Sequence, residues 1–146
     1  MKNLRMLSGA GLFALAVFLI QGCNVSTANI SSFKTYSDKE GKVETTSFKA
    51  GETVYAKATI SNNPGKVKVK YSMIPEADFD DMKKGESIKE LETSYDMNGD
   101  GVATYTFAPT AAFPGGTFKI NADMLNEAGE KKDSKTATVT FAVAGQ

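Results

Sequence analysis

The sequence predicts an all-β protein, a sandwich of about seven to eight antiparallel strands that follows an N-terminal signal peptide. Two patterns in the domain carry this prediction. From Phe33 onward apolar residues alternate with polar ones, which is the period of strands with one buried face. Clusters of Gly, Pro, Asn, Asp and Ser separate the alternating segments and are typical of turns. Many short strands separated by turns favour a sandwich.

The first 22 residues have the layout of a secretory signal. Lys2 and Arg5 give a positive start, and an uncharged apolar stretch follows from Gly9 to Ile20. A membrane-spanning helix needs about 20 apolar residues, so this stretch is too short to cross a bilayer comfortably. Removal of the signal would leave 124 of the 146 residues, enough for one domain with a hydrophobic core.

The apolar stretch ends in Leu19-Ile20-Gln21-Gly22-Cys23, which holds the only cysteine of the chain. An odd cysteine in an exported protein needs an explanation. The segment resembles the lipobox of bacterial lipoproteins, which implies cleavage before Cys23 and a diacylglycerol on its thiol. Ordinary secretion and an uncleaved anchor helix are the alternatives. Asn24 is not the Asp that retains lipoproteins at the inner membrane in enteric-type bacteria, so the resemblance favours the outer membrane.

The chain therefore divides into three predicted parts. Residues 1–22 are the signal peptide, residues 23–32 are the lipidated Cys23 with a flexible tether, and residues 33–146 are the β-sandwich domain. The tether prediction rests on residues 24–32, which are small, mostly polar and uncharged.

The strands are predicted from alternation, most clearly in residues 53–60. The full set is 33–36, 43–48, 53–60, 66–73, 90–97, 102–108, 117–125 and 136–143, with Val143 expected to face inward. Turn residues at 61–65 predict that the third and fourth of these strands form a hairpin. Residues 75–84 break the alternation, because acidic residues come first, lysines last and Gly85 follows, as in a short helix.

Three stretches carry a further resemblance: Phe48-Lys49-Ala50-Gly51-Glu52-Thr53-Val54, the hairpin Asn98-Gly99-Asp100-Gly101-Val102-Ala103-Thr104-Tyr105, and Phe113-Pro114-Gly115-Gly116-Thr117-Phe118. They are similar to segments of the immunoglobulin-like modules of bacterial envelope proteins. The resemblance implies an immunoglobulin-like β-sandwich. The chain departs from antibody domains in lacking both core cysteines and the core Trp, so its core depends on Phe, Val, Ile, Met and Tyr.

Composition excludes several functions. The chain has no His and no Trp, and its only arginine, Arg5, lies in the signal. Without His, the Ser-His-Asp and Cys-His mechanisms and the usual zinc sites are excluded. Without Arg and with 15 lysines against 17 acidic residues after the signal, nucleic-acid binding is not expected. We predict that the protein is not an enzyme, although carboxylate pairs, Ser-Lys dyads and oxygen-ligand metal sites remain open.

One loop has the spacing of a calcium site. Asp96, Asn98 and Asp100 place oxygen side chains at alternate positions, and Gly101 takes the sixth position, as in the first half of an EF-hand loop. The twelfth position falls on Phe107, where an EF-hand has a bidentate Glu. The competing interpretation is a metal-free turn, because Asn-Gly and Asp-Gly favour hairpins. No other cofactor is predicted.

One strand face is a candidate partner surface. Tyr55 and Lys57 alternate with apolar residues and are expected on an outer face, where a tyrosine ring could contact a protein or a sugar. The absence of Trp disfavours the sugar. Lys66, Lys68 and Lys70 form a basic stripe that is predicted to be solvated and to protect an edge strand. Attraction to an anionic lipid surface is the alternative.

These observations predict a lipid-anchored β-sandwich of the bacterial envelope that works without catalysis. Acyl chains on Cys23 would hold it to the membrane, and sheet faces or loops would bind an envelope protein as a binding or accessory module. The alternatives are a calcium-stabilised structural or adhesion domain and a small carbohydrate-binding or enzymatic envelope protein.

Overall fold

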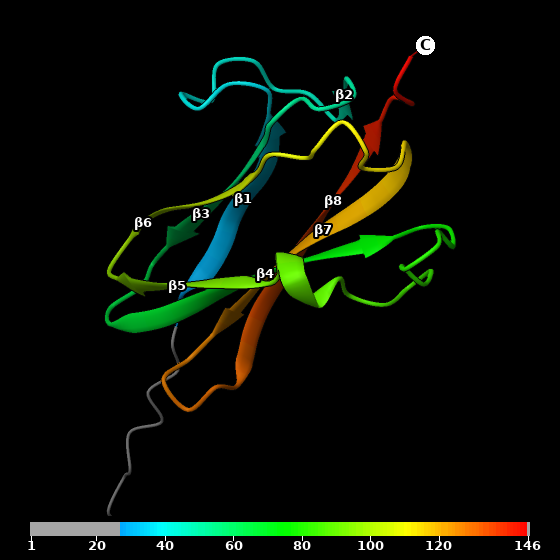
Figure 1. Cartoon of the computed structure of the whole chain (residues 1–146). Helices are drawn as coiled ribbons and strands as arrows, with labels where there is room; N and C mark the ends of the chain where they lie inside the picture. Colours follow the sequence, from blue (N-terminus) through cyan, green and yellow to red (C-terminus); the bar gives the residue numbers. More distant parts are fainter. Residues whose placement is uncertain (1–26, 146) are drawn as a thin grey trace, which may run out of the picture.

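The computed structural model describes residues 27–145, which form two sheets packed face to face (Figure 1). The smaller sheet has the order β1 (Asn29–Tyr36), β3 (Val54–Ser61), β6 (Gly101–Phe107). The larger sheet has the order β2 (Ser47–Phe48), β8 (Lys131–Phe141), β7 (Gly116–Leu125), β4 (Lys66–Pro75), β5 (Thr93–Asn98). A short 3-10 helix, η1 (Lys89–Leu91), precedes β5. The predicted all-β sandwich is confirmed.

The strand order is that of an immunoglobulin-like domain. Such domains place strands A, B and E in one sheet and strands C, F and G in the other, with C′ beside C in variable-type domains. Here β1, β3 and β6 take the places of A, B and E, while β4, β5, β7 and β8 take those of C, C′, F and G. Every strand pair is antiparallel except β2 with β8, which is parallel.

Alternation of apolar and polar residues predicted most of these strands, because each sheet buries one of its two faces. In β3 every second residue from Val54 to Ile60 is buried, and the intervening side chains are half-buried. The same alternation runs through β4 and β7. Several boundaries differ from the predictions, three of them in β2 and around β8. Only Ser47–Phe48 of the predicted strand 43–48 is a strand, β8 begins at Lys131, and Val143 lies beyond β8 with 54% of its surface exposed.

The predicted hairpin of residues 53–60 and 66–73 is wrong. β3 pairs with β1 and β6, whereas β4 pairs with β5 and β7, so the 61–65 turn carries the chain from one sheet to the other. The 98–101 turn likewise links β5 to β6 across the sandwich and does not close a hairpin. Turn residues encode a reversal of direction, but the packing of apolar faces decides which sheet the next strand joins.

The predicted helix at residues 75–84 is also absent. β4 continues to Pro75, and the chain then reverses through paired backbone hydrogen bonds between Phe79 and Met82, of 2.9 and 3.2 Å. This reversal lets the Phe79 ring stack on the buried Phe118 at 5.4 Å between centroids. A single short helix gains little on its own, and burial of the aromatic ring outweighs the favourable charge order.

β1 begins four residues before the predicted strand, so residues 29–32 belong to the sheet and not to the tether. Ile30 is only 2% exposed, and its backbone N–H donates to the Asp133 carboxylate of β8 at 2.8 Å. Ala28 is also buried, and the Thr27 hydroxyl donates to the Asn62 carbonyl at 3.2 Å. The domain therefore holds the chain from Thr27 onward.

Tyr71 of β4 lies at the centre of the core, where antibody domains carry a Trp on strand C. It is fully buried, and its hydroxyl donates to the Ala103 carbonyl of the opposite sheet at 2.8 Å. Tyr105 stacks on it at 5.3 Å between centroids, and Phe33 and Tyr95 pack around it. Burial raises the pKa of Tyr71 and that of Tyr105 well above the usual range, so both phenols stay protonated.

Candidate binding surface

The outer face of the three-stranded sheet is the surface that carries the predicted partner residues. Tyr55 of β3 is directly opposite Tyr36 of β1 and Thr106 of β6. In the next row along the sheet, Lys57 is opposite Lys34 and Thr104. Paired residues share a face, so the prediction that Tyr55 and Lys57 lie on an outer face agrees with the observed burial.

Lys57 is held in place by the loop that follows β1. Its Nζ donates to the Lys39 carbonyl at 2.6 Å and lies 5.6 Å from the centre of the Tyr36 ring. A Cβ at Gly41 would lie 2.8 Å from this Nζ, and Gly41 has a φ of +79°, so the loop needs glycine there. The ammonium therefore serves to order the loop beside Tyr36, and the tyrosines are left as the main contact groups.

The loop itself is fixed by Asp38. The Asp38 carboxylate accepts hydrogen bonds from the backbone N–H groups of Lys42 and Val43. These bonds lower the pKa of the Asp38 carboxyl from its ordinary value, and the bond from Lys42 has the largest effect. Lys34 pairs with Glu44 at 2.8 Å, where the loop returns to β1. The result is a preorganised border beside the two tyrosines, which reduces the ordering cost of binding.

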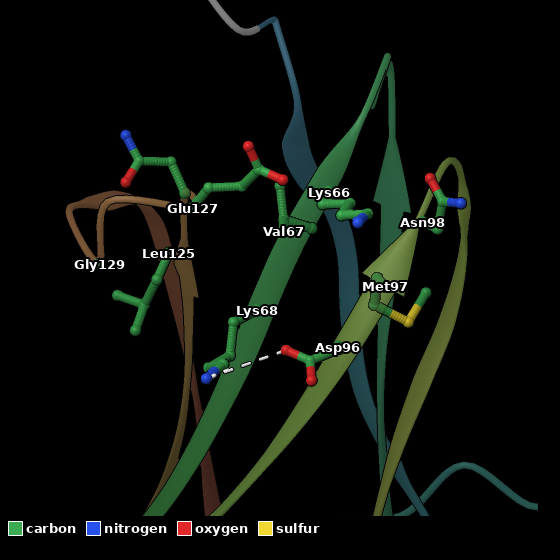
Figure 2. Close-up of a pocket in the computed structure, with 10 residues that line it drawn as sticks. Lys66, Val67, Lys68, Asp96, Met97, Asn98, Leu125, Glu127 and Gly129 are labelled. Carbon is green, nitrogen blue, oxygen red and sulfur yellow. Dashed lines mark ion pairs between the residues drawn. The ribbon is translucent and has the colours of Figure 1, made fainter.

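The predicted calcium residues lie at the opposite end of the sandwich and have separate contacts. Asp96 faces Lys68 at 3.9 Å, as Figure 2 shows. The Asp100 carboxylate accepts the backbone N–H of Asn63 at 2.7 Å, and Asn98 lies opposite Lys66 on β4. Within residues 27–145, His, Cys, Asp and Glu side chains form no group of three or more that could hold a metal ion. The calcium site stays a prediction.

Asp100 and Asn63 join the 61–65 and 98–101 turns, the two turns that cross between the sheets, by hydrogen bonds. Asn63 is 7% exposed, and its amide donates to the Gly99 carbonyl at 2.8 Å while its side-chain oxygen accepts the Gly65 N–H at 3.2 Å. The Asp100 bond to the Asn63 backbone completes this network. Because both turns change sheets, the network fixes the end of the sandwich.

Asp100→Ala is expected to lower the free energy of unfolding by about 1–2 kcal/mol, because the Asn63 N–H loses a charged acceptor. Asp96→Ala is the matched control and is expected to change it by less than about 0.5 kcal/mol, because its ion pair is exposed. Urea unfolding with a chelator present measures both. Equal losses of unfolding free energy in the two variants would show that the Asp100 bond does not stabilise the two turns.

The same pair of variants tests calcium. A melting temperature that rises with millimolar calcium, and that stops rising in Asp96→Ala, would establish the sequence-based site. A rise that both variants retain would place any calcium elsewhere.

A groove of about 580 Å³ lies beside Asp96 and Asn98 (Figure 2). It runs between the first residues of β4 and the β7–β8 turn, and its apolar lining residues are Val67, Met97 and Leu125. Sequence reasoning did not find it. The groove depends on the β7–β8 turn lying next to β4, and no local pattern encodes that neighbourhood.

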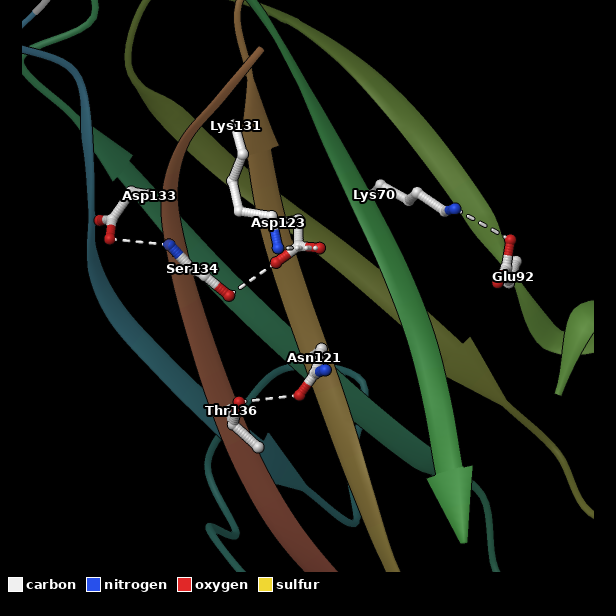
Figure 3. Close-up of polar contacts among 8 residues, drawn as sticks. All are labelled: Lys70, Glu92, Asn121, Asp123, Lys131, Asp133, Ser134 and Thr136. Carbon is white, nitrogen blue, oxygen red and sulfur yellow. Dashed lines mark hydrogen bonds and ion pairs between the residues drawn. The ribbon is translucent and has the colours of Figure 1, made fainter. Parts of the chain in front are cut away.

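The outer face of the five-stranded sheet is polar and internally paired (Figure 3). Lys70 pairs with Glu92 at 3.0 Å, and Asp123 pairs with Lys131 at 3.1 Å. Asn121 accepts the Thr136 hydroxyl at 2.7 Å. β4 lies between β5 and β7, so the prediction that the lysine stripe protects an edge strand is wrong. Lys68 and Lys70 instead face carboxylates of the neighbouring strand β5 and the segment before it.

Cys23, the predicted lipid attachment site, lies outside the described residues. Among residues 27–145, no helix has the length and apolar content that a bilayer crossing requires.

No family model matches the chain, and no curated protein does. Among solved structures, a family 76 glycoside hydrolase from a bovine Bacteroides thetaiotaomicron strain is 11% identical, with a TM-score of 0.47 over 75% of this chain. This chain spans 20% of that enzyme. A Niemann-Pick type C2 protein from the Japanese carpenter ant is 15% identical, with a TM-score of 0.44 over 82% of this chain and 96% of that one.

The PmoD soluble domain from Methylocystis sp. is 12% identical, with a TM-score of 0.42 over 75% of this chain and 89% of that one. Likenesses at this level carry no functional argument. The fold assignment rests on the two sheets and their strand order.

Proposed function

We propose that this protein is a lipid-anchored binding or accessory module of the bacterial envelope that acts through protein contacts and without catalysis. The anchor is an acylated Cys23, the outer membrane is the favoured location, and the partner surface is the outer face of β1, β3 and β6. The observation that carries the partner surface is the opposed pair Tyr36 and Tyr55, bordered by a preorganised loop.

A contrast between the two outer faces supports this one over the other. On the five-stranded sheet the outward Lys70, Asp123 and Asn121 are each bonded to a neighbouring side chain, so a partner there would have to displace existing bonds. On the three-stranded sheet the outward row of Tyr36, Tyr55 and Thr106 is aromatic and hydroxylic. Tyrosine supplies a large rigid contact area with a polar tip, which is typical of protein interfaces.

The lipobox residues and the composition support the rest. The segment ending in Gly22-Cys23 resembles a lipoprotein processing site, and no His or Arg follows it. A tethered module meets partners on the same membrane at a raised effective concentration, so a small contact face is sufficient.

The test is site-specific crosslinking in intact cells. A photoreactive residue replaces Thr106 beside the tyrosines, or Thr138 on the outer face of the other sheet as the matched control. We expect a discrete heavier adduct from position 106, at least several-fold more abundant than any from position 138. Adding Tyr36→Thr and Tyr55→Thr, which keep strand propensity, should remove it.

Adducts of equal abundance from the two positions, or an adduct at 106 that persists without both tyrosines, would refute the assigned face. The melting curves of the tyrosine variants show whether these variants are folded.

A further inference from the structure

The start of the described chain is fixed to one end of the sandwich. The Thr27 hydroxyl bonds to Asn62 in the turn between β3 and β4, and Ala28 is buried. Three turns lie at this end, at residues 61–65, 98–101 and 126–130, and we call them together the entry end. Asn63 ties the first turn to the second, and a groove of about 590 Å³ is lined by residues of the first and third. Figure 1 shows the β3–β4 and β7–β8 turns at the end where β1 starts.

Only three residues, 24–26, separate Cys23 from Thr27. Four Cα–Cα steps of about 3.8 Å reach at most about 15 Å. The polar headgroup layer of a bilayer is roughly 5–7 Å thick on each side. Acyl chains on Cys23 that sit in the hydrocarbon would therefore keep the entry end within about 10 Å of the headgroup surface.

We propose that the entry end is a membrane-contact surface that rests on phospholipid headgroups and sets the domain upright. This inference rests on the acylated Cys23 of the proposed function. It deepens that function by giving the module an orientation. The predicted tether of residues 24–32 would have allowed the domain to turn freely, but the early start of β1 removes most of it.

Charge at the entry end is nearly balanced. Within two residues of the three turns lie three lysines and four acidic side chains: Lys66, Lys131, Lys132, Asp96, Asp100, Glu127 and Glu130. The contact is therefore imposed by the short connection and not by attraction to anionic lipid, and it should survive high salt.

The orientation places the partner face where a partner can reach it. Tyr55 lies six residues before Ser61 along β3, and Tyr36 lies seven residues after Asn29 along β1. At about 3.3 Å per residue, both tyrosines stand roughly 20 Å above the entry end. A partner would then meet them with a domain that projects from the membrane.

The test measures depth on vesicles. The full chain is produced in a bacterium, and the acylated protein is placed in phosphatidylethanolamine–phosphatidylglycerol vesicles that contain a headgroup-spin-labelled lipid. A fluorophore is attached at Ala128→Cys, in the exposed β7–β8 turn, or at Lys49→Cys, in an exposed turn at the far end. The acylated Cys23 offers no competing thiol. We expect quenching several-fold stronger at 128 than at 49, with no loss in high salt.

A second variant lengthens the connection with nine Gly and Ser residues after Asn24. It should lower the quenching at 128 toward that at 49 while the protein stays on the vesicles. Equal quenching at the two positions in protein of acylated mass would overturn the orientation and leave the proposed function standing. A mass without acyl chains would overturn the proposed function and the orientation together.

Discussion

Replacement of Tyr71 by alanine is expected to lower the free energy of unfolding by about 3–5 kcal/mol, a large fraction of the roughly 5–15 kcal/mol of an ordinary domain. Tyr71 is fully buried between the sheets and contacts three aromatic rings. Its removal leaves a cavity between the two sheets, and the hydrogen-bonded strands on either side cannot move together to fill that cavity. It also leaves the Ala103 carbonyl without its donor.

Two variants separate the contributions. Tyr71→Phe keeps the ring and removes only the hydroxyl, so a loss of about 1–2 kcal/mol is expected. Tyr55→Ala removes a tyrosine from the outer face and should cost about 1 kcal/mol or less. Urea unfolding measures all three, with the slope checked for constancy. A Tyr71→Ala loss no larger than that of Tyr55→Ala would show that Tyr71 is not the centre of the core.

Tyr71 also shows what alternation can and cannot predict. Alternation in residues 66–73 places Tyr71 on the face opposite the lysine stripe, and the structure shows that this face is buried. Alternation gives every inward residue the same weight, however, because it does not contain the register between strands. The central place of Tyr71 follows from its neighbours on β5, β6 and β7, which come from distant parts of the chain.

Connections were harder to predict than strands. β3 was predicted to within one residue at each end, because its alternation is a local property. The 61–65 turn was predicted as a reversal, but its change of sheet depends on which faces are apolar across the whole domain. At Phe79 a local charge pattern favoured a helix, and a stacking partner nearly forty residues away decided otherwise.

The candidate surface was predicted in part for the same reason. Alternation was sufficient to place Tyr55 and Lys57 on an outer face. Tyr36 joined them only through the β1–β3 register, and the bond from Lys57 to the Lys39 carbonyl depends on the shape of a loop. The binding surface therefore needed tertiary structure, whereas the residue types on it did not.

Among Cys23→Ala chains that have lost residues 1–22, we expect a shift from the membrane fraction to the aqueous fraction that lowers the ratio between them by more than about 100-fold. A diacylglycerol brings two acyl chains, and each buried methylene contributes about 0.8 kcal/mol to binding. The entry end carries almost no net charge and cannot replace that contribution. Fractionation of the producing cells and the intact mass of the purified protein measure the two sides of the prediction.

Gln21→Ala is the matched control for Cys23→Ala. Lipoboxes usually have a small residue at this position, so the variant should keep both the acylated mass and the membrane location. The mass also separates two ways in which Cys23→Ala could stay on the membrane. A chain that still carries residues 1–22 would be held by its uncleaved signal. A chain without residues 1–22 that nevertheless stays bound would be held by the domain itself, which would contradict an anchor at the thiol.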